Sequence, residues 1–184
     1  MTDSSSVAGV VLAAGEGKRF GGPKAPFEYE GERLVDRAVR RLREAGCDPV
    51  LVILGAWQGQ VDDALVIVNH GWEEGMGSSL RIALKWVNAT TEAKDALITL
   101  VDLPGLTSEA VSRVIDAPAG IAVATFNGER GHPVRIPRAH FRHLIDTVAG
   151  DEGAREFLAG REDVQWVEVA DVADGFDLDL SPTP

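Results

Sequence analysis

The sequence predicts an α/β fold with a mostly parallel sheet flanked by helices. Short apolar runs alternate almost to the end of the chain with amphipathic segments whose apolar residues recur at helical spacing. Such alternation is typical of parallel strands joined by right-handed helical crossovers. The chain of 184 residues has no internal repeat and no linker-like stretch. We therefore expect one domain over residues 7–184, preceded by a disordered tail at residues 1–6.

The predicted strands are short apolar runs that end at glycine, asparagine, aspartate or proline. In chain order they are Val7–Ala13, Val50–Leu54, Val66–Val68, Ala96–Val101, Ile121–Phe126, Pro133–Ile136 and Val164–Val169, with Phe176–Leu180 as a short extended segment. Asn127–Gly131 is rich in turn-forming residues and is predicted to be a loop.

The predicted helices each place apolar residues on one face. In chain order they are Glu32–Glu44, Gln58–Ala64, Ser78–Trp86, Thr107–Asp116, Phe141–Val148 and Gly153–Ala159. Ala45-Gly46 ends the first of them. Thr107 is the expected N-cap of the fourth, and Ala110 at the third helical position leaves that cap without a reciprocal Glu.

Composition narrows the function classes. The formal net charge of −11 disfavours a nucleic-acid partner, because phosphate backbones would be repelled overall. No stretch reaches the ~20 apolar residues of a membrane span, so no membrane partner is expected. The polar start lacks the basic and apolar regions of a signal peptide. The single Cys47 fits a reducing compartment as a buried structural thiol. These features predict a cytoplasmic protein.

Residues 9–24 are predicted to pass from a buried strand into a glycine-rich basic loop. Such a loop can expose backbone N–H groups, and Lys18, Arg19 and Lys24 add positive charge, which suits a polyphosphate. Two common phosphate motifs do not fit. Phe20 stands where the dinucleotide fingerprint needs its third glycine, and no Gly-Lys-Ser/Thr follows as a P-loop requires.

Acidic residues near two chain positions could hold a metal ion. Asp102 follows a predicted buried strand, where it either binds Mg²⁺ or caps the turn before Pro104. Asp177 and Asp179 alternate on a predicted extended segment, so both carboxylates could face one ion. The alternative for this pair is a solvated acidic tail.

The segment Trp72–Leu80 joins a loop to a predicted helix start. Gly75 and Gly77 permit close backbone approach, and Ser78, Ser79 and the helix N-terminus offer donors to a base, ribose or anion. The alternative is an ordinary capped helix with Trp72 and Met76 in the core.

Taken together, motifs from Val10 to Pro182 resemble the MobA-like NTP transferases, and in particular molybdenum cofactor cytidylyltransferases. The carrying segments are Leu-Ala-Ala-Gly-x-Gly-x-Arg-Phe-Gly-x-x-Lys at 12–24, Trp-x-x-Gly-Met-x-x-Ser-Leu at 72–80, Leu-Val-Asp-Leu-Pro at 100–104, Gly-His-Pro at 131–133 and Gly-Asp-x-Gly-Ala-Arg at 150–155. Residues 176–182 resemble the late Asp-Ile-Asp-Thr-Pro element, but one extra residue separates the second Asp from Pro182.

This resemblance implies a Rossmann-like sheet of the GT-A type and an Mg²⁺-dependent nucleotidyltransferase, with Mn²⁺ as the alternative ion. Such enzymes transfer a nucleoside monophosphate from an NTP to the phosphate of a molybdopterin-type cofactor and release pyrophosphate. Ala13-Ala14-Gly15 resembles the CTP-using branch, whereas guanylyl-transferring relatives carry Ala-Gly-Gly, in which a missing methyl leaves room for a larger base contact. A molybdoenzyme or its chaperone is a further partner that the resemblance suggests.

The resemblance also assigns site residues. The catalytic residues are Arg19, Lys24 and Asp102; the nucleotide-binding residues are Leu12, Ala13, Ala14, Gly15, Gly17, Lys24, Gly75 and Ser79; the metal ligands are Asp102 with Asp177 or Asp179, Asp177 being favoured; the acceptor-binding residues are His132, Asp151 and Arg155.

Three other functions remain open from sequence. One is a guanylyl- or other NMP-transferase that acts on another phosphorylated small molecule, such as a sugar or alcohol phosphate. Another is a glycosyltransferase, although those present a paired-acid Asp-x-Asp where this chain has Asp102-Leu103-Pro104. The third is a non-catalytic carrier of a nucleotide or of molybdopterin.

Overall fold

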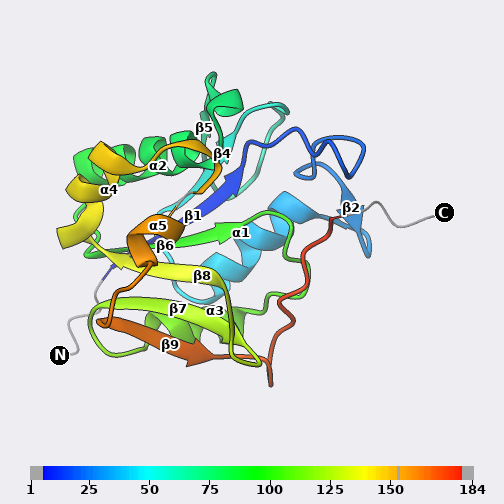
Figure 1. Cartoon of the computed structure of the whole chain (residues 1–184). Coiled ribbons are helices and arrows are strands. Elements are labelled where there is room, and N and C mark those ends of the chain that lie inside the picture. The colour runs from blue at the N-terminus through cyan, green and yellow to red at the C-terminus, as the bar shows by residue number, and fades with distance from the viewer. Residues whose placement is uncertain (1–5, 153, 180–184) are drawn as a thin grey trace.

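A seven-stranded sheet lies between two layers of helices in the computed structural model, which describes residues 6–152 and 154–179 (Figure 1). The strand order is β5-β4-β1-β6-β8-β7-β9. Six strands run in the same direction, and β8 runs antiparallel to both of its neighbours. The strands are β1 Val7–Ala13, β4 Val50–Leu54, β5 Leu65–Val68, β6 Asp95–Leu100, β7 Ile121–Phe126, β8 Glu129–Pro137 and β9 Val164–Glu168, and a separate hairpin pairs β2 Glu28–Tyr29 with β3 Glu32–Arg33. The predicted mostly parallel α/β fold is confirmed.

The helices cover both faces of the sheet. They are α1 Leu34–Glu44, α2 Met76–Thr90, α3 Ser108–Ile115, α4 Phe141–Thr147 and α5 Arg155–Leu158, with single 3₁₀ turns η1 Trp72–Glu74, η2 Arg138–His140 and η3 Gly150–Glu152. Figure 1 shows α2 beside α4 on one side of the sheet and α1 with α3 on the other. Among the described residues, none of the helices is long and apolar enough to cross a membrane.

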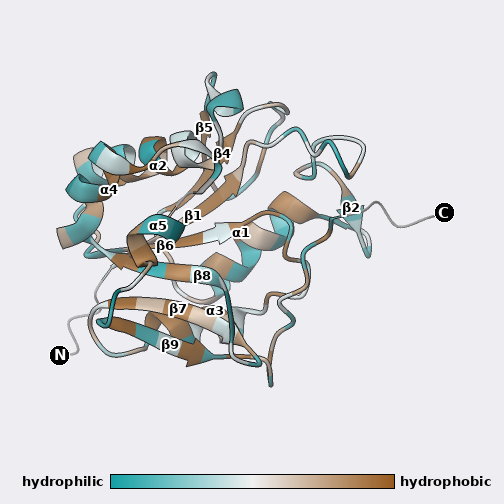
Figure 2. Ribbon diagram, viewed as in Figure 1, coloured by the Kyte–Doolittle hydropathy of each residue, from teal (hydrophilic) through white to brown (hydrophobic). Residues whose placement is uncertain are grey.

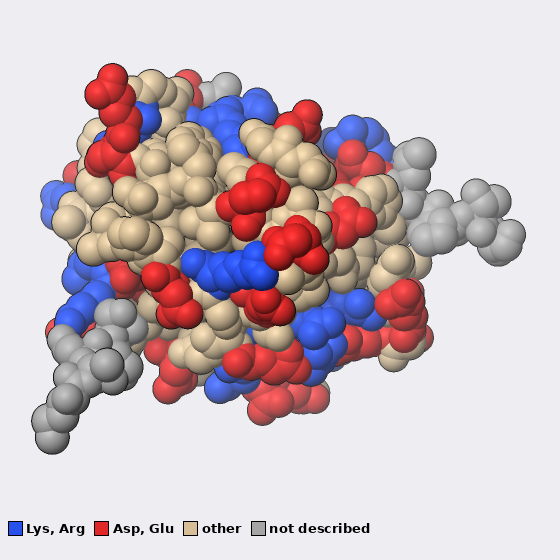
Figure 3. Space-filling model, turned by 90° about the horizontal axis from the view of Figure 1, so that it is seen from below, with Lys and Arg blue, Asp and Glu red and all other residues tan. Residues whose placement is uncertain are grey.

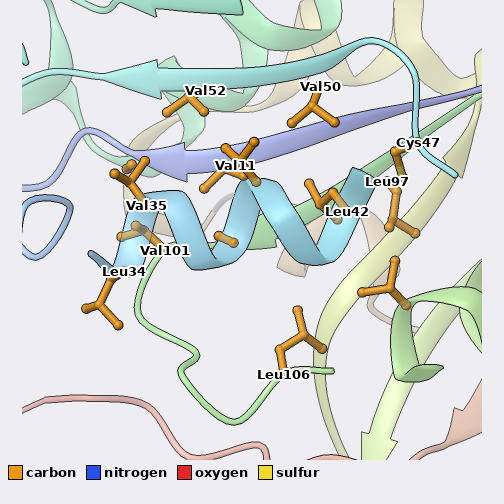
Figure 4. Packing of buried hydrophobic residues seen from close by; sticks show 14 of the residues in the cluster. Val11, Leu34, Val35, Leu42, Cys47, Val50, Val52, Leu97, Val101 and Leu106 are labelled. Atoms are coloured by element: carbon orange, nitrogen blue, oxygen red, sulfur yellow. The ribbon is translucent and has the colours of Figure 1, made fainter. Parts of the chain in front are cut away.

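The two faces of β1 explain why the sheet is buried on both sides. Val7 and Val11 face the core beneath α1 and α3, whereas Ala8 and Val10 face the core beneath α2 and α4. Alternate residues of a strand point to opposite faces, so a strand covered on both sides reads as a continuous apolar run. Figure 2 shows the strands as the most hydrophobic part of the ribbon, and Figure 4 shows α1 packed against β1 and β4.

Cys47 lies in the core on the α1 side, next to Leu42 in Figure 4. Burial raises the pKa of its thiol to about 12, so the thiolate is scarce at neutral pH. The thiol is therefore structural, as predicted.

Strand direction brings distant parts of the chain to one edge. The carboxyl ends of β1, β4, β5, β6, β7 and β9 lie at the same edge, and the reversal of β8 places its first residues there as well. The loops at 14–24, 69–75, 101–106 and 127–132 therefore share one side of the molecule. Ligands of open α/β sheets bind at this edge.

Two sequence predictions were wrong in their element type. Residues 58–64 form no helix, because Gly59 packs under the Trp57 ring and Asp63 takes a positive φ of 57°. Residues 129–131 belong to β8 rather than to a loop. Asn127 and Gly128 both have positive φ, at 53° and 83°, and so close a tight two-residue hairpin turn.

Other boundaries shift by a few residues. Residues 32–33 pair with β2, so α1 begins at Leu34, and α2 begins at Met76 and continues to Thr90. The Thr107 cap is confirmed, since its hydroxyl accepts a hydrogen bond of 3.1 Å from the Ala110 N–H. Ser6 is held at the start of β1, where its carbonyl accepts from the Lys94 N–H at 2.9 Å. Residues 1–5 and 180–184 lie outside the described range. We keep one domain over residues 7–184 as a proposal, supported by the single large sheet.

Arg135 of β8 binds the end of α3 from within the protein. The residue is only 3% exposed, and its guanidinium donates hydrogen bonds to the carbonyls of Ile115, Ala117 and Gly120, at 2.5, 2.8 and 3.0 Å. These carbonyls satisfy a buried charge that would otherwise be costly. Arg135 thus ties the reversed strand to the helix layer.

Glu168 at the end of β9 holds the β7–β8 turn. Its carboxylate accepts hydrogen bonds from the N–H groups of Gly128, Asn127 and Ala170 and from the Thr125 hydroxyl, at 2.8–3.1 Å. Donors to the charged form lower the pKa of Glu168 to about 2, with the Gly128 N–H as the largest cause.

We expect Glu168→Gln to lower the stability at pH 7. A lowered pKa stabilises the fold fully above the unfolded value near 4.5, and this stabilisation is lost as the pH falls towards 2. The difference between wild type and variant in urea unfolding should therefore shrink as the pH falls from about 5 to 2. Glu162→Gln, which removes the same charge just before β9, is the control. A difference that is constant with pH would contradict this account.

Candidate active site

Three adjoining cavities lie along the carboxyl edge of the sheet. The first, of about 440 Å³, is bounded by the glycine loop and the start of α2. The central one, of about 180 Å³, contains Lys24 and Asp102. The second, of about 400 Å³, lies over β6, β8 and β7. Met76 lines all three, and Leu100 lines the central and second cavities. The arrangement offers two ligand pockets on either side of a charged centre.

Lys24 and Asp102 form the charged centre. The Lys24 ammonium lies 2.7 Å from Asp102 Oδ2, and their side chains are 14% and 19% exposed. It also lies 3.6 Å from Asp179 Oδ1, which Arg19 approaches at 3.5 Å. The structure thus brings together both predicted catalytic cations and two predicted metal ligands. Arg19 is 79% exposed, so its pair with Asp179 is worth little, whereas the shielded Lys24 pair is held firmly.

The C-terminal segment is attached directly to Asp102. The Leu178 N–H donates to the Asp102 carbonyl at 3.0 Å, and the Leu178 side chain is buried in the core on the α1 side. This attachment holds Asp177 and Asp179 near the centre. The pKa of Asp177 is raised, mainly by partial burial and then by repulsion from the Asp102 and Asp179 carboxylates. Asp102 and Asp179 therefore both approach the Lys24 ammonium, and Asp177 lies within the electrostatic influence of all three groups.

These residues fit a divalent cation as an incomplete site. Asp102 Oδ1 is buried and has no hydrogen-bond partner among the described residues, so this oxygen has spare capacity for a ligand. Within residues 6–152 and 154–179, no three acidic, His or Cys side chains are already grouped to hold one ion. A hard cation held by one or two carboxylates takes its remaining ligands from substrate phosphates and water, as Mg²⁺ commonly does.

The glycine loop is closed on itself at Gly17. The Gly17 carbonyl accepts from the N–H groups of Gly21 and Gly22, at 2.9 and 3.1 Å, and its φ is +62°. A Cβ on Gly17 would lie 1.9 Å from the Gly22 oxygen. At Gly15, by contrast, a Cβ would meet no atom within 4 Å, and Gly15 lines both the first and central cavities. Gly17 shapes the loop, whereas Gly15 leaves space for a ligand.

A buried polar network shapes the start of α2. Asn69 is 2% exposed, and its amide donates to the hydroxyls of Ser78 and Ser79, at 2.8 and 3.0 Å. The amide oxygen of Asn69 accepts from the Gly71 N–H at 2.9 Å. Ser79 lines the first cavity, and its hydroxyl is held in place by the Asn69 amide.

The close approach predicted at Gly75 and Gly77 is made by the protein's own chain. A Cβ on Gly75 would lie 2.5 Å from the Gly150 carbonyl carbon, and one on Gly77 would lie 2.8 Å from that of Ala149. This packing carries Asp151 into the first cavity. Asp151 is thus placed with the predicted nucleotide-binding residues, away from His132 and Arg155, with which the sequence grouped it.

His132 and Arg155 do lie together, because both line the second cavity. Burial lowers the pKa of His132 to about 4, although the nearby Asp102 carboxylate acts in the opposite direction. The imidazole is therefore neutral at pH 7. The charged groups that line this cavity are Arg130 and Arg155 together with the carboxylates of Glu129 and Asp177.

Several residues that line the cavities were not predicted as site residues from the sequence. Trp72 and Met76 line the first cavity, so they are not simply core residues, and Arg130 lines the second. Trp72 and Met76 lay within one of the sequence motifs, but nothing in their residue types separates a cavity wall from a core. Arg130 lay in a predicted loop, and only the strand register shows which way it faces. Asn69 could have been predicted from its position, because a polar residue directly after a buried strand is a candidate to hold the neighbouring helix start.

A row of cavities at the carboxyl edge of the sheet, a glycine-rich basic loop suited to phosphate and a centre of carboxylates define a nucleotidyltransferase. A family model described as the MobA-like NTP transferase domain matches residues 9–166. The chain therefore belongs to the MobA-like NTP transferase family, as the sequence motifs predicted.

Individual relatives support this membership. A protein named nicotine blue oxidoreductase from Paenarthrobacter nicotinovorans is 36% identical over 97% of this chain and 94% of its own length. A protein named "Probable molybdenum cofactor guanylyltransferase" from Mycobacterium ulcerans is 31% identical over 94% of this chain and 88% of its own length. The crystal structure of Rv0371c from Mycobacterium tuberculosis H37Rv superposes with a TM-score of 0.79 at 30% identity, covering 96% of this chain and 93% of that one. A second structure of Rv0371c, in complex with manganese, superposes with a TM-score of 0.75 at 28% identity, covering 96% and 94%.

The contrast between Gly15 and Gly17 gives a prediction. Gly15→Ala should fold like wild type and weaken nucleotide binding about ten- to a hundredfold, because the new methyl group enters the cavity. Gly17→Ala should lower stability by more than about 1 kcal/mol, because alanine disfavours a positive φ and would meet Gly22. Thermal unfolding and calorimetric titration with a nucleoside triphosphate separate the two. Unchanged nucleotide affinity in a folded Gly15→Ala protein would contradict the prediction that Gly15 borders the nucleotide.

Proposed function

We propose that this protein transfers CMP from CTP to the phosphate of a molybdopterin-type cofactor and releases pyrophosphate. The observation that carries the proposal is the row of three adjoining cavities with Lys24 and Asp102 in the middle one. A two-substrate transfer needs two pockets that meet at the reacting atoms. The first cavity is assigned to CTP and the second to the acceptor.

The transfer is an in-line displacement at phosphorus. An oxygen of the acceptor phosphate attacks the α-phosphorus of CTP, the bond from that phosphorus to the bridging oxygen breaks, and pyrophosphate leaves. The attacking phosphate is already ionised, so no general base is required. Positioning and charge neutralisation then supply the rate acceleration.

The chain's own residues divide these tasks. Lys24 and Arg19 neutralise the triphosphate and the departing pyrophosphate. Backbone groups of Leu12, Ala13 and Gly15 hold the nucleotide at the end of β1, since these residues line the first or central cavity. His132 and Arg155 line the acceptor side, and Asp151 is reassigned to the nucleotide side because it lines the first cavity.

A divalent cation would be held by Asp102 together with Asp177 or Asp179. When bound, it would supply neutralisation of phosphate charge between the two substrates. Mg²⁺ is the proposed ion, with Mn²⁺ as the alternative. The support is the buried Asp102 Oδ1, which has no hydrogen-bond partner among the described residues, and the existence of a similar structure, that of Rv0371c, in complex with manganese.

CTP is proposed over GTP because of Ala14. Its side chain is 7% exposed and it lines the first cavity, where it limits the room for a base. Several relatives are named guanylyltransferases, so the choice of base is a claim about this chain alone.

A cytoplasmic location is proposed as well, since the substrate is an NTP and Cys47 is an unpaired thiol. A molybdoenzyme or its chaperone is the proposed recipient of the product.

The relative named nicotine blue oxidoreductase favours a second candidate function, a redox reaction on a small molecule. The site offers less support for it, because Phe20 occupies the third glycine position of the dinucleotide fingerprint. Oxidation of NADH or NADPH with an added dye, without pyrophosphate release, would identify this function.

The first test follows pyrophosphate release with Mg²⁺, molybdopterin and each NTP in turn. Release with CTP is expected, and Asp102→Asn should lower it at least ~100-fold while the fold survives, because charge neutralisation at the reacting phosphates is lost. Asp146→Asn, an exposed change on α4, is the control. No release with any NTP would overturn the proposal, and normal turnover in Asp102→Asn would overturn the metal assignment.

The second test addresses the base. Ala14→Gly should raise the ratio of kcat/KM for GTP to that for CTP about tenfold or more, because the removed methyl frees space for a purine. Ala8→Gly makes the same change on β1 in the buried core and should leave the ratio unchanged. An Ala14→Gly protein with the wild-type ratio would show that Ala14 does not select the base.

A further inference from the structure

Asp151 lines the first cavity as a carboxylate without a protein partner. No residue in the described part of the chain donates a hydrogen bond to its side chain or forms an ion pair with it. The cavity has two other lining carboxylates, and both act on Lys18. Glu16 pairs with the Lys18 ammonium at 2.7 Å, and Glu73 helps to raise the pKa of the same group. The Asp151 carboxylate is therefore available to a ligand.

The packing of the main chain holds Asp151 beside the start of α2. A Cβ on Gly75 would lie 2.6 Å from Asp151 Oδ1, so this oxygen lies directly against the Gly75 backbone. Arg81 of α2 donates a hydrogen bond of 3.3 Å to the Val148 carbonyl, just before this point in the chain. Figure 1 shows the segment between α4 and α5 running beside α2, with which η3 is in contact. The position of the carboxylate is thus set from α2 as well as from its own segment.

Ser79 offers the opposite hydrogen-bonding character at the end of the first turn of α2. Its hydroxyl oxygen accepts from the Asn69 amide nitrogen at 3.0 Å. The amide cannot be reversed, because its oxygen accepts from the Gly71 N–H at 2.9 Å. Ser79 is 2% exposed and lines the first cavity, and no described group accepts its proton. The cavity therefore presents an unused donor at Ser79 and an unused acceptor at Asp151.

The lining residues separate the base end of the first cavity from the phosphate end. Three residues line both the first and the central cavity: Leu12, Gly15 and Met76. The central cavity contains Lys24, so a ribose that joins the phosphates to the base belongs beside these shared residues. Ala14, Ser79 and Asp151 line the first cavity without lining the central one, which places them at the base end. An unpaired carboxylate would also repel a triphosphate.

Cytosine fits this pair of groups, whereas uracil does not. Cytosine carries an exocyclic amino group on the same edge as a ring nitrogen and a carbonyl oxygen, so it can donate to Asp151 and accept from Ser79. Uracil has a carbonyl oxygen in place of the amino group, and two acceptors that face each other form no hydrogen bond. Purines with an amino group meet the limit that Ala14 sets on size.

We propose that Asp151 accepts a hydrogen bond from the exocyclic amino group of the base and so selects CTP over UTP. Ala14 and Asp151 then divide the selection, because the methyl group limits the size of the base and the carboxylate requires an amino group. This inference rests on the proposed function, since it deepens the assignment of the first cavity to CTP. It also differs from the acceptor-binding role that the sequence motifs suggested for Asp151.

The test measures nucleotide binding by calorimetric titration with Mg²⁺ and without an acceptor. CTP, UTP and dCTP are each titrated into wild type, Asp151→Ala, Asp151→Asn and Glu73→Gln. Glu73→Gln removes a different carboxylate from the same cavity and is the matched control. The third nucleotide, dCTP, lacks the 2′-hydroxyl and reports on any contact with the ribose. Circular dichroism confirms that each variant is folded.

Wild type should bind CTP about ten- to a hundredfold more tightly than UTP, because a hydrogen bond to a charged group is made with one base and lost with the other. Asp151→Ala should weaken CTP binding about tenfold or more and leave UTP binding within about threefold. Asp151→Asn should bring the two affinities within about threefold of each other, because its amide can rotate and donate to the uracil oxygen. Glu73→Gln should change both affinities by the same factor, and dCTP should depend on Asp151 as CTP does.

Equal affinities of wild type for CTP and UTP would overturn the proposal. An equal loss of CTP and UTP affinity in Asp151→Ala, with dCTP unaffected, would place the carboxylate on the ribose and overturn it as well. A change in the CTP-to-UTP ratio in Glu73→Gln as large as in Asp151→Asn would do the same, because it would indicate a general effect of charge. Selective CTP binding that depends on Asp151, without pyrophosphate release when molybdopterin is added, would refute the transfer reaction and support the base contact. The two failures are therefore distinguishable.

Discussion

The ion pair between Lys24 and Asp102 holds the active-site edge together. Its partners are 78 residues apart and come from the glycine loop and the end of β6. The main chain of Asp102 also accepts a hydrogen bond from Leu178, which secures the C-terminal segment. One residue thereby joins three parts of the chain that would otherwise be independent loops. The two flanking cavities meet at this point because both share residues with the central cavity.

The charge distribution follows a simple physical logic. The chain carries a net charge of −11, and Figure 3 shows acidic and basic side chains interspersed over the face drawn there. Against this background, the cations that line or approach the cleft are local. Lys24 and Arg19 approach the central carboxylates, while Arg130 and Arg155 line the second cavity. Cations gathered at one cleft of an acidic protein suit the small phosphorylated substrates of the proposed function better than a nucleic acid, whose phosphate backbone would be repelled overall.

The sequence was informative where a pattern has a single physical solution. Continuous apolar runs such as Val7–Ala13 can be satisfied only by burial on both faces, so the parallel sheet followed directly. The glycine-rich basic loop and Asp102 could likewise be predicted, because strand ends and turn residues fix where such side chains lie. The Thr107 cap was visible for the same reason, since its interaction is local.

What the sequence did not determine depends on contacts between distant segments. The reversal of β8 depends on the tight turn at Asn127-Gly128 and on Glu168, which lies 40 residues away from Gly128. The position of Asp151 depends on Gly75 and Gly77, which allow residues 149–151 to pack on α2. None of these pairings leaves a periodic signal in the sequence.

The central claim is that Asp102 forms a metal site that only a bound nucleotide completes. Titration of the protein with Mn²⁺, followed by electron paramagnetic resonance with and without CTP, tests it most directly. We expect the protein alone to bind Mn²⁺ weakly. With CTP present, we expect the Mn²⁺ affinity to be at least tenfold higher than that of the protein alone and higher than that of CTP alone. The enhancement should be lost in Asp102→Asn. Equal Mn²⁺ affinity with and without CTP, or an enhancement that survives in Asp102→Asn, would contradict the claim.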